Sequence, residues 1–137
     1  MAWVFDASIA MAWCFVDEKT PETDLLFHRL KSDPAIVPSL WHLEVANVLT
    51  QVMRTKKRLT HSERAEFLET MGRAKIEIDP QTARQAWTAI LNLADQYALS
   101  TYDAAYLELA MRRGVELATL DKELRRAAAK AGVKVIP

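Results

Sequence analysis

Short apolar runs alternate with longer segments in which apolar residues recur at helical spacing. The runs are three or four residues long, and they predict strands at 3–5, 35–37, 75–78, 116–119 and 134–136. The longer segments predict helices at 8–15, 20–31, 39–56, 60–73, 81–97, 101–114 and 121–132. Because helices separate the strands, the sequence predicts an α/β fold with a mostly parallel sheet covered on both faces.

Several of the expected helix ends carry capping residues. Thr20 precedes Pro21, which suits the first position of a helix. The segment Thr60-His61-Ser62-Glu63 matches a capping box. The helix that starts near Thr101 is expected to stop at Gly114, since glycine favours the conformation that ends a helix.

Size and composition fit one globular domain over residues 1–137. Half of the residues are hydrophobic and 26% are charged, as in proteins that bury a substantial core. The 18 basic and 18 acidic residues cancel. A neutral chain has no general attraction to RNA or DNA, so nucleic acid would have to meet a local patch of charge. The absence of charge repulsion between copies also permits self-association.

Cysteine content and hydropathy indicate in which cellular compartment the protein is expected. Cys14 is the only cysteine, which excludes an intramolecular disulfide and a site built from several thiolates. A lone cysteine suits a reducing cytosol. Uncharged stretches such as 7–16 are too short to span a bilayer, and the pattern of a signal peptide is absent. We therefore expect a cytoplasmic protein.

Four carboxylates that are far apart in sequence stand where an apolar segment meets a turn or a helix. Asp6 ends the first strand, and Asp121 follows the fourth. Asp103 stands in the first turn of a helix, and Glu44 interrupts the apolar stripe of another. In open α/β sheets, sites form beyond the carboxyl ends of the strands, where Asp6 and Asp121 are expected. Core-directed carboxylates are rare unless something offsets their charge, so convergence of the four would require a divalent cation.

Helical spacing supports an inward direction for two of these acids. Glu44 shares the apolar face of its helix, and Asn47 on the same face is a further polar candidate beside the site. Asp103 shares a face with apolar residues and with Tyr106. Glu108 falls on the opposite side of that helix, and we expect it to be solvated.

Each acid also has a purely structural interpretation. Asp121 and Asp103 suit the N-terminal turn of a helix, and Asp6 suits a turn hydrogen bond at a strand end. Glu44 is the exception, because the middle of a helix offers no capping role. Asp79 precedes a proline at the expected start of a helix, and we interpret it only as a cap.

A site of four carboxylates has the chemistry of a hard cation site. Neighbouring negative charges raise one another's pKa values, and Mg²⁺ or Mn²⁺ would restore the ionised forms. Oxygen ligands without clustered cysteine or histidine favour these ions over Zn²⁺. Such an ion can polarise a phosphoryl oxygen and orient a water for attack. The leading hypothesis from the residues is a metal-dependent enzyme that cleaves phosphodiester bonds.

Neighbouring residues are candidates for supporting roles. Ser8 and Thr119 each stand two residues from an acid and could hold a metal ligand or a bound water, and ordinary turn hydrogen bonds explain them equally well. Three cations follow Asp121, namely Lys122, Arg125 and Arg126. They could contact RNA phosphates or simply solvate their helix. The basic segment 54–58 is interpreted as a solvated helix end.

Four segments together resemble the signature segments of PIN-domain proteins, and most closely those of VapC-type toxins of bacterial toxin–antitoxin pairs. They are Phe5-Asp6-Ala7-Ser8, Leu43-Glu44-Val45-Ala46-Asn47, Ser100-Thr101-Tyr102-Asp103-Ala104-Ala105-Tyr106 and Leu117-Ala118-Thr119-Leu120-Asp121-Lys122-Glu123-Leu124. The resemblance covers the whole chain in order, and every acidic position matches.

The resemblance implies a three-layer α/β/α sandwich with a parallel sheet of about five strands. It implies an endoribonuclease that depends on Mg²⁺ or Mn²⁺. The acids at its catalytic metal site would be Asp6, Glu44, Asp103 and Asp121, with Ser8 and Thr119 nearby. It also implies a homodimer and a small antitoxin encoded beside the toxin, whose tail would block the site.

Other functions stay open on the sequence. A phosphatase of the haloacid-dehalogenase type needs Asp-x-Asp after the first strand, but its third position is Ser8 here. A phosphoreceiver domain needs an adjacent acidic pair there, which is absent. A non-catalytic PIN-like binding module would have no reason to keep four acids or to bind Mn²⁺. A DNA-directed nuclease is a further option, because nothing in the residues senses a 2′-hydroxyl.

Overall fold

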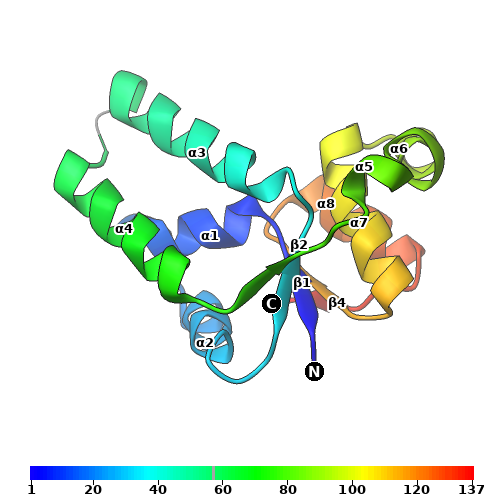
Figure 1. The fold of residues 1–137 in the computed structure, drawn as a ribbon, viewed down its shortest axis with the longest axis horizontal. Coiled ribbons are helices and arrows are strands. Elements are labelled where there is room, and N and C mark those ends of the chain that lie inside the picture. The colour runs from blue at the N-terminus through cyan, green and yellow to red at the C-terminus, as the bar shows by residue number, and fades with distance from the viewer. Residues whose placement is uncertain (57) are drawn as a thin grey trace.

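Five short strands form one parallel sheet in the order β3-β2-β1-β4-β5 (Figure 1). Their bounds are β1 Trp3–Phe5, β2 Ala35–Val37, β3 Ile76–Ile78, β4 Glu116–Ala118 and β5 Val135–Ile136. This computed structural model describes residues 1–56 and 58–137. The four strand pairings it describes are parallel, which confirms the predicted α/β fold.

The sequence of the central strand β1 explains its position. Its three residues are fully buried and apolar, because helices cover both faces of the sheet and leave no face for polar side chains. β1 pairs with β4 in a register that places Phe5 opposite Ala118. Asp6 and Thr119, the next residue of each strand, therefore leave the sheet side by side.

The α-helices are α1 Ala7–Cys14, α2 Pro21–Arg29, α3 Trp41–Gln51, α4 His61–Arg73, α5 Thr82–Gln85, α6 Leu91–Tyr97, α7 Thr101–Arg113 and α8 Lys122–Lys130. A 3₁₀ turn, η1 Val16–Glu18, follows α1, and the described residues form two π-helical turns, η2 Val52–Lys56 and η3 Ala86–Ile90. η2 continues α3, and η3 joins α5 to α6. The helices predicted at 39–56 and 81–97 are therefore present, but each contains a π-helical turn.

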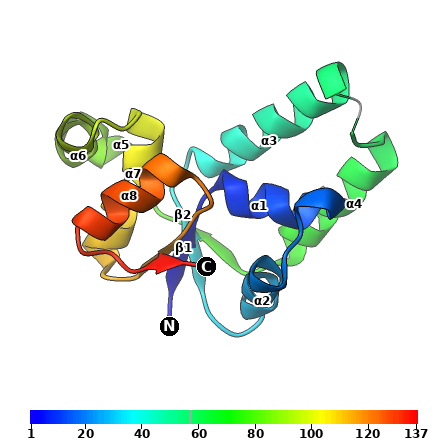
Figure 2. The same ribbon diagram turned by 180° about the vertical axis from the view of Figure 1, so that it is seen from behind.

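The helices lie in two layers, one on each side of the sheet (Figures 1 and 2). Helices α1 to α4 occupy one side, and α5 to α8 occupy the other. α7 packs directly against β1 and β4. This arrangement confirms the three-layer α/β/α sandwich.

A cluster of aromatic side chains packs the α1 to α3 layer against the sheet. The ring of Phe5 lies 5.4 Å from Trp3, 5.2 Å from Trp13 and 5.3 Å from Trp41, measured between centroids. Full burial of a large apolar side chain contributes roughly 1.5–3 kcal/mol. Because Trp13 belongs to α1 and Trp41 to α3, the cluster holds both helices in place above the carboxyl end of β1.

The expected capping signals are confirmed. Thr20 and Thr60 each form a capping box at the start of α2 and α4. Gly114 ends α7 in the left-handed conformation, with φ of 64°. No helix in the described part of the chain is both long and apolar enough to cross a membrane.

The basic segment 54–58 is described only in part, because Lys57 lies outside the described residues. Arg58 forms ion pairs with Asp17 at 2.7 Å and with Glu18 at 3.0 Å. This guanidinium is therefore paired with acids of the chain.

Candidate acidic active site

The four predicted acids all lie at the N-terminal ends of helices. Asp6 is the N-cap of α1, Asp121 is the N-cap of α8, and Asp103 stands in the first turn of α7. Glu44 lies in the first turn of α3, because this helix begins at Trp41 rather than near residue 39. The prediction of a mid-helix position for Glu44 is therefore wrong. A helix N-terminus carries partial positive charge, so each acid has a local reason to be ionised.

Both oxygens of the Asp6 carboxylate are held by hydrogen bonds. Its Oδ1 accepts the backbone N–H groups of Ser8 at 3.0 Å and Ile9 at 3.3 Å, and also the Ser8 hydroxyl at 2.5 Å. Its Oδ2 accepts the hydroxyl of Thr119 at 2.5 Å. The side chain is only 5% exposed. These bonds fix the carboxylate at the carboxyl end of β1.

The same two hydroxyls connect Asp6 to the turn between β4 and α8. Ser8 Oγ accepts the N–H of Leu120 at 2.9 Å, and Thr119 Oγ1 accepts the N–H of Asp121 at 3.1 Å. Each hydroxyl thus accepts a hydrogen bond from a backbone N–H of this turn and donates one to Asp6. The geometry brings Ser8 and Thr119 beside Asp6 and the turn that carries Asp121.

Glu44 is held in a different way. The phenol of Tyr106 donates a 2.5 Å hydrogen bond to Glu44 Oε1, across 62 positions of sequence. Tyr106 is 1% exposed and belongs to α7, one turn after Asp103. From its helical spacing, Tyr106 is predicted only to share a helix face with Asp103. Its spacing of three residues from Asp103 was the available signal for a role at the site.

The four acids share one electrostatic environment. Burial raises the pKa of Asp103, and the negative charges of Asp121, Asp6 and Glu44 raise it further, to about 6. Burial also raises the pKa values of Asp6 and Glu44, and the hydrogen bonds that these carboxylates accept offset only part of the rise. Within the described residues, no ion pair involves any of the four acids. The described part of the chain therefore gathers negative charge here and pairs none of it with a basic side chain.

The chemistry of the donors fits a hard divalent cation. Carboxylate oxygens are the ligands that Mg²⁺ and Mn²⁺ prefer, and a cation would reverse the raised pKa of Asp103. Asp121 uses only its Oδ2 as a cap, where it accepts the Leu124 N–H at 2.8 Å. In the part of the chain that is described, no three Asp, Glu, His or Cys side chains already form a close metal-binding group. The acids would therefore have to draw closer together around an ion.

The remaining predicted site residues differ in their exposure and in their hydrogen-bond and ion-pair partners. Asn47 is exposed on α3, one turn after Glu44. Lys122 and Arg126 are exposed on α8, and Arg126 forms an ion pair with Glu123. The guanidinium of Arg125 donates to Thr119 O at 2.7 Å and to Pro137 O at 3.0 Å, so two of its donors are engaged within the chain.

A second buried acidic pair lies at the other end of α7. Asp79 accepts the Gln81 N–H at 3.2 Å, and α5 begins just after Gln81, at Thr82. Both Asp79 oxygens also accept hydrogen bonds from Arg112, at 3.1 and 2.8 Å. The same guanidinium donates to Glu108 at 2.7 and 3.1 Å. Asp79 is therefore more than a cap. The prediction of a solvated Glu108 is wrong, since it is 5% exposed.

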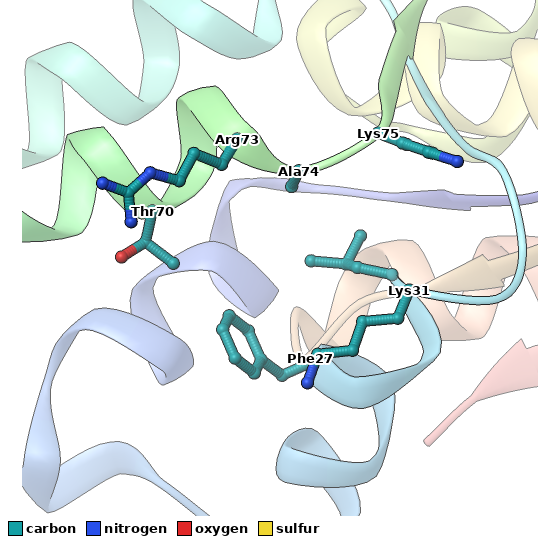
Figure 3. Close-up of a pocket in the computed structure, with 7 residues that line it drawn as sticks. Phe27, Lys31, Thr70, Arg73, Ala74 and Lys75 are labelled. Carbon is teal, nitrogen blue, oxygen red and sulfur yellow. The ribbon is translucent and has the colours of Figure 1, made fainter.

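A hollow of about 350 Å³ lies between α2 and α4, and none of the four acids lines it (Figure 3). Its lining residues are Phe27, Leu30, Lys31, Thr70, Arg73, Ala74 and Lys75. The inner wall is apolar, and three cations stand around it. The hollow carries no acid–base or metal-binding chemistry, so the candidate active site is the group of acids beyond the sheet.

Comparison with known families agrees with the fold and the acids. The family model described as PIN domain matches residues 3–130. The chain therefore belongs to the PIN domain family, and the predicted family resemblance is confirmed. Among curated proteins, none is similar enough in sequence to be matched with this chain.

Solved structures of low sequence identity share the fold over 98% of this chain. PAE2754 from Pyrobaculum aerophilum superposes with a TM-score of 0.71 at 22% identity, over 83% of its own chain. VapBC2 from Rickettsia felis, solved bound to a DNA fragment from its promoter, gives 0.65 at 14% identity over 97% of its chain. VapC20 from Mycobacterium tuberculosis, described as a sarcin-ricin loop cleaving toxin, gives 0.63 at 17% identity over 99% of its chain.

Proposed function

We propose that this chain is a Mg²⁺- or Mn²⁺-dependent endoribonuclease and the toxin of a toxin–antitoxin pair. The observation that carries the proposal is that Asp6, Glu44, Asp103 and Asp121 all stand at helix N-terminal ends, with Asp103 within reach of the charges of the other three. Membership in the PIN domain family supports this assignment. RNA is favoured over DNA because the chain shares its fold with VapC20, a toxin described as cleaving the sarcin-ricin loop.

The four acids would hold the metal between the N-termini of α1, α3, α7 and α8. When bound, the ion would polarise a phosphoryl oxygen and lower the pKa of a water. Ser8 and Thr119 hold both oxygens of Asp6 before any ligand arrives, which reduces the reorganisation that binding requires. Lys122 and Arg126, exposed on α8, are the proposed phosphate contacts.

The proposed partners are an antitoxin and a second copy of the chain. Similarity to VapBC2 supports the antitoxin. The hollow between α2 and α4 offers apolar contact beside Lys31, Arg73 and Lys75, which suits an acidic partner segment. Trp87 is 89% exposed and stands one helical turn before exposed Leu91, and such apolar surface supports a homodimer.

The test is cleavage of total cellular RNA by the purified protein with Mg²⁺ or Mn²⁺, against a chelator control. Asp6→Asn keeps the shape of the side chain and removes its charge, so it should lower the cleavage rate by at least about 100-fold. Asp95→Asn is the matched control, because Asp95 is exposed on α6, and it should cleave like the wild type.

Discrete fragments that require both the metal and Asp6 would support the ribonuclease, and their ends would identify the substrate. Cleavage that persists in chelator, or that Asp6→Asn retains, would contradict the proposed site. If the wild type neither cleaves RNA nor binds Mn²⁺, the chain is better described as a non-catalytic binding module. Cleavage of DNA in place of RNA would correct the substrate and keep the site.

A further inference from the structure

The acids of the candidate site are held by two kinds of contact. Asp6 and Asp121 accept backbone N–H groups of the helices that they cap, so local structure fixes them. Glu44 receives no such bond from α3, whose N-terminus has no side-chain cap. Its hydrogen bond comes instead from Tyr106, a residue of another helix. The position of Glu44 therefore depends on a tertiary contact.

That contact joins the two helical layers of the fold. α3 lies on one side of the sheet and α7 on the other (Figure 1). α7 carries Asp103 in its first turn and Tyr106 one turn later, and it packs against β1, which leads into Asp6. One rigid helix thus supplies an acid of the site and also the phenol that meets Glu44.

Tyr106 is buried, and the described partner of its hydroxyl is Glu44 Oε1. A buried hydroxyl without a partner costs free energy, so burial favours this hydrogen bond. The bond occupies Oε1 and leaves Oε2 as the oxygen without a hydrogen-bond partner in the described structure.

We propose that Tyr106 is a positioning residue that fixes Glu44 relative to Asp103 and directs Oε2 toward a bound divalent cation. The proposal rests on the proposed function, since it assigns Tyr106 to the same metal site. Residues that hydrogen-bond to a metal ligand orient that ligand, and their loss typically weakens metal binding by about 10- to 100-fold. Tyr106 needs no contact with the metal or with RNA for this role.

The experiment is a calorimetric titration of the full chain with MnCl₂ at neutral pH, without RNA. Tyr106→Phe removes only the hydroxyl and should raise the Kd for Mn²⁺ by about 10-fold or more. Tyr102→Phe is the matched control on the same helix, because Tyr102 is 63% exposed, and its Kd should equal that of the wild type. Thermal unfolding of each variant reports on the fold independently.

A double-mutant cycle separates positioning from general packing. If Tyr106 acts through Glu44, then Glu44→Gln with Tyr106→Phe should bind Mn²⁺ no more weakly than Glu44→Gln alone. A further independent loss in the double variant would overturn the proposal. Equal Kd values for the wild type and Tyr106→Phe would also overturn it, while leaving the proposed function intact.

A second variant keeps the test decisive if Tyr106→Phe does not fold. Glu44→Asp retains the carboxylate but shortens the side chain, so Tyr106 can no longer reach it, and the Kd for Mn²⁺ should again rise by about 10-fold. An unchanged Kd in Glu44→Asp would contradict the positioning role. A wild type that does not bind Mn²⁺ at all would instead overturn the proposed function and the positioning role together.

Discussion

The two ends of α7 differ in whether a basic side chain pairs with the acids that lie there. At the N-terminal end, burial and then the charges of the neighbouring acids raise the pKa of Asp103 to about 6, and no described ion pair offsets these charges. At the C-terminal end, Arg112 donates to both Asp79 and Glu108. Burial opposes the charge of Asp79, but the hydrogen bonds and charge of Arg112 outweigh it and hold its pKa below the ordinary value.

The difference separates a structural acidic cluster from a functional one. An acid that pairs with a basic side chain of the same chain has its charge balanced as soon as the protein folds, and this pairing stabilises the native state. An acid without a cation costs stability until something arrives from outside. The same helix therefore provides an internal control for the candidate site.

Removing the cation at the C-terminal end of α7 should change the stability of the protein the most. Arg112→Met leaves two buried carboxylates unpaired and should lower the free energy of unfolding by about 3–5 kcal/mol. Urea denaturation measures this change. Arg113→Met is the control, since Arg113 meets Glu77 only at 3.8 Å with both side chains partly exposed, and it should cost less than about 1 kcal/mol. Equal losses would show that Arg112 has no special role.

Removal of charge should have opposite effects on stability at the two ends. Without divalent cations at pH 7.5, Asp103→Asn relieves repulsion and should raise Tm by about 3 °C, whereas Asp79→Asn should lower it, because Arg112 loses a charged partner. Asp103→Asn should also reduce RNA cleavage by at least about 100-fold. A fall in Tm for Asp103→Asn would indicate that Asp103 is a structural acid like Asp79.

A smaller change is expected in how the stability of the metal-free protein depends on pH. The folded state holds a proton on Asp103 more tightly than the unfolded state, so the contribution of Asp103 to stability should fall as pH rises from about 4 to about 6. Asp103→Asn lacks this contribution, and the difference between the two melting curves isolates it. Asp79 has the opposite sign, because its pKa is lowered, and its contribution should be lost only below about pH 4. Parallel curves for the wild type and Asp103→Asn would contradict the shared environment of the four acids.

Much of this molecule could be predicted from local patterns. β1 and β2 have the predicted bounds, because three consecutive apolar residues suit a strand covered on both faces. Thr20, Thr60 and Gly114 mark helix ends as expected, since a cap depends on residues a few positions away. The four acids were identifiable for the same reason, as each interrupts a regular local pattern.

The errors concern residues whose surroundings come from distant parts of the chain. Glu108 falls on the polar side of its helix by spacing, but residues 104–110 of α7 are all buried, so this helix has no solvated face there. Asp79 meets Arg112 across 33 positions, and Glu44 meets Tyr106 across 62. Helical spacing carries no information about which element covers a given face.

Local residue patterns specify the alternating elements, the parallel sheet and the four acids that resemble a PIN-domain signature. Tertiary folding decided which acids receive a cation from the described part of the chain and which do not. It also decided that Tyr106 meets Glu44. The physical reason is that strands, turns and caps depend on neighbours within a few residues, whereas the ionisation of a buried carboxylate depends on charges and donors that folding brings from other helices.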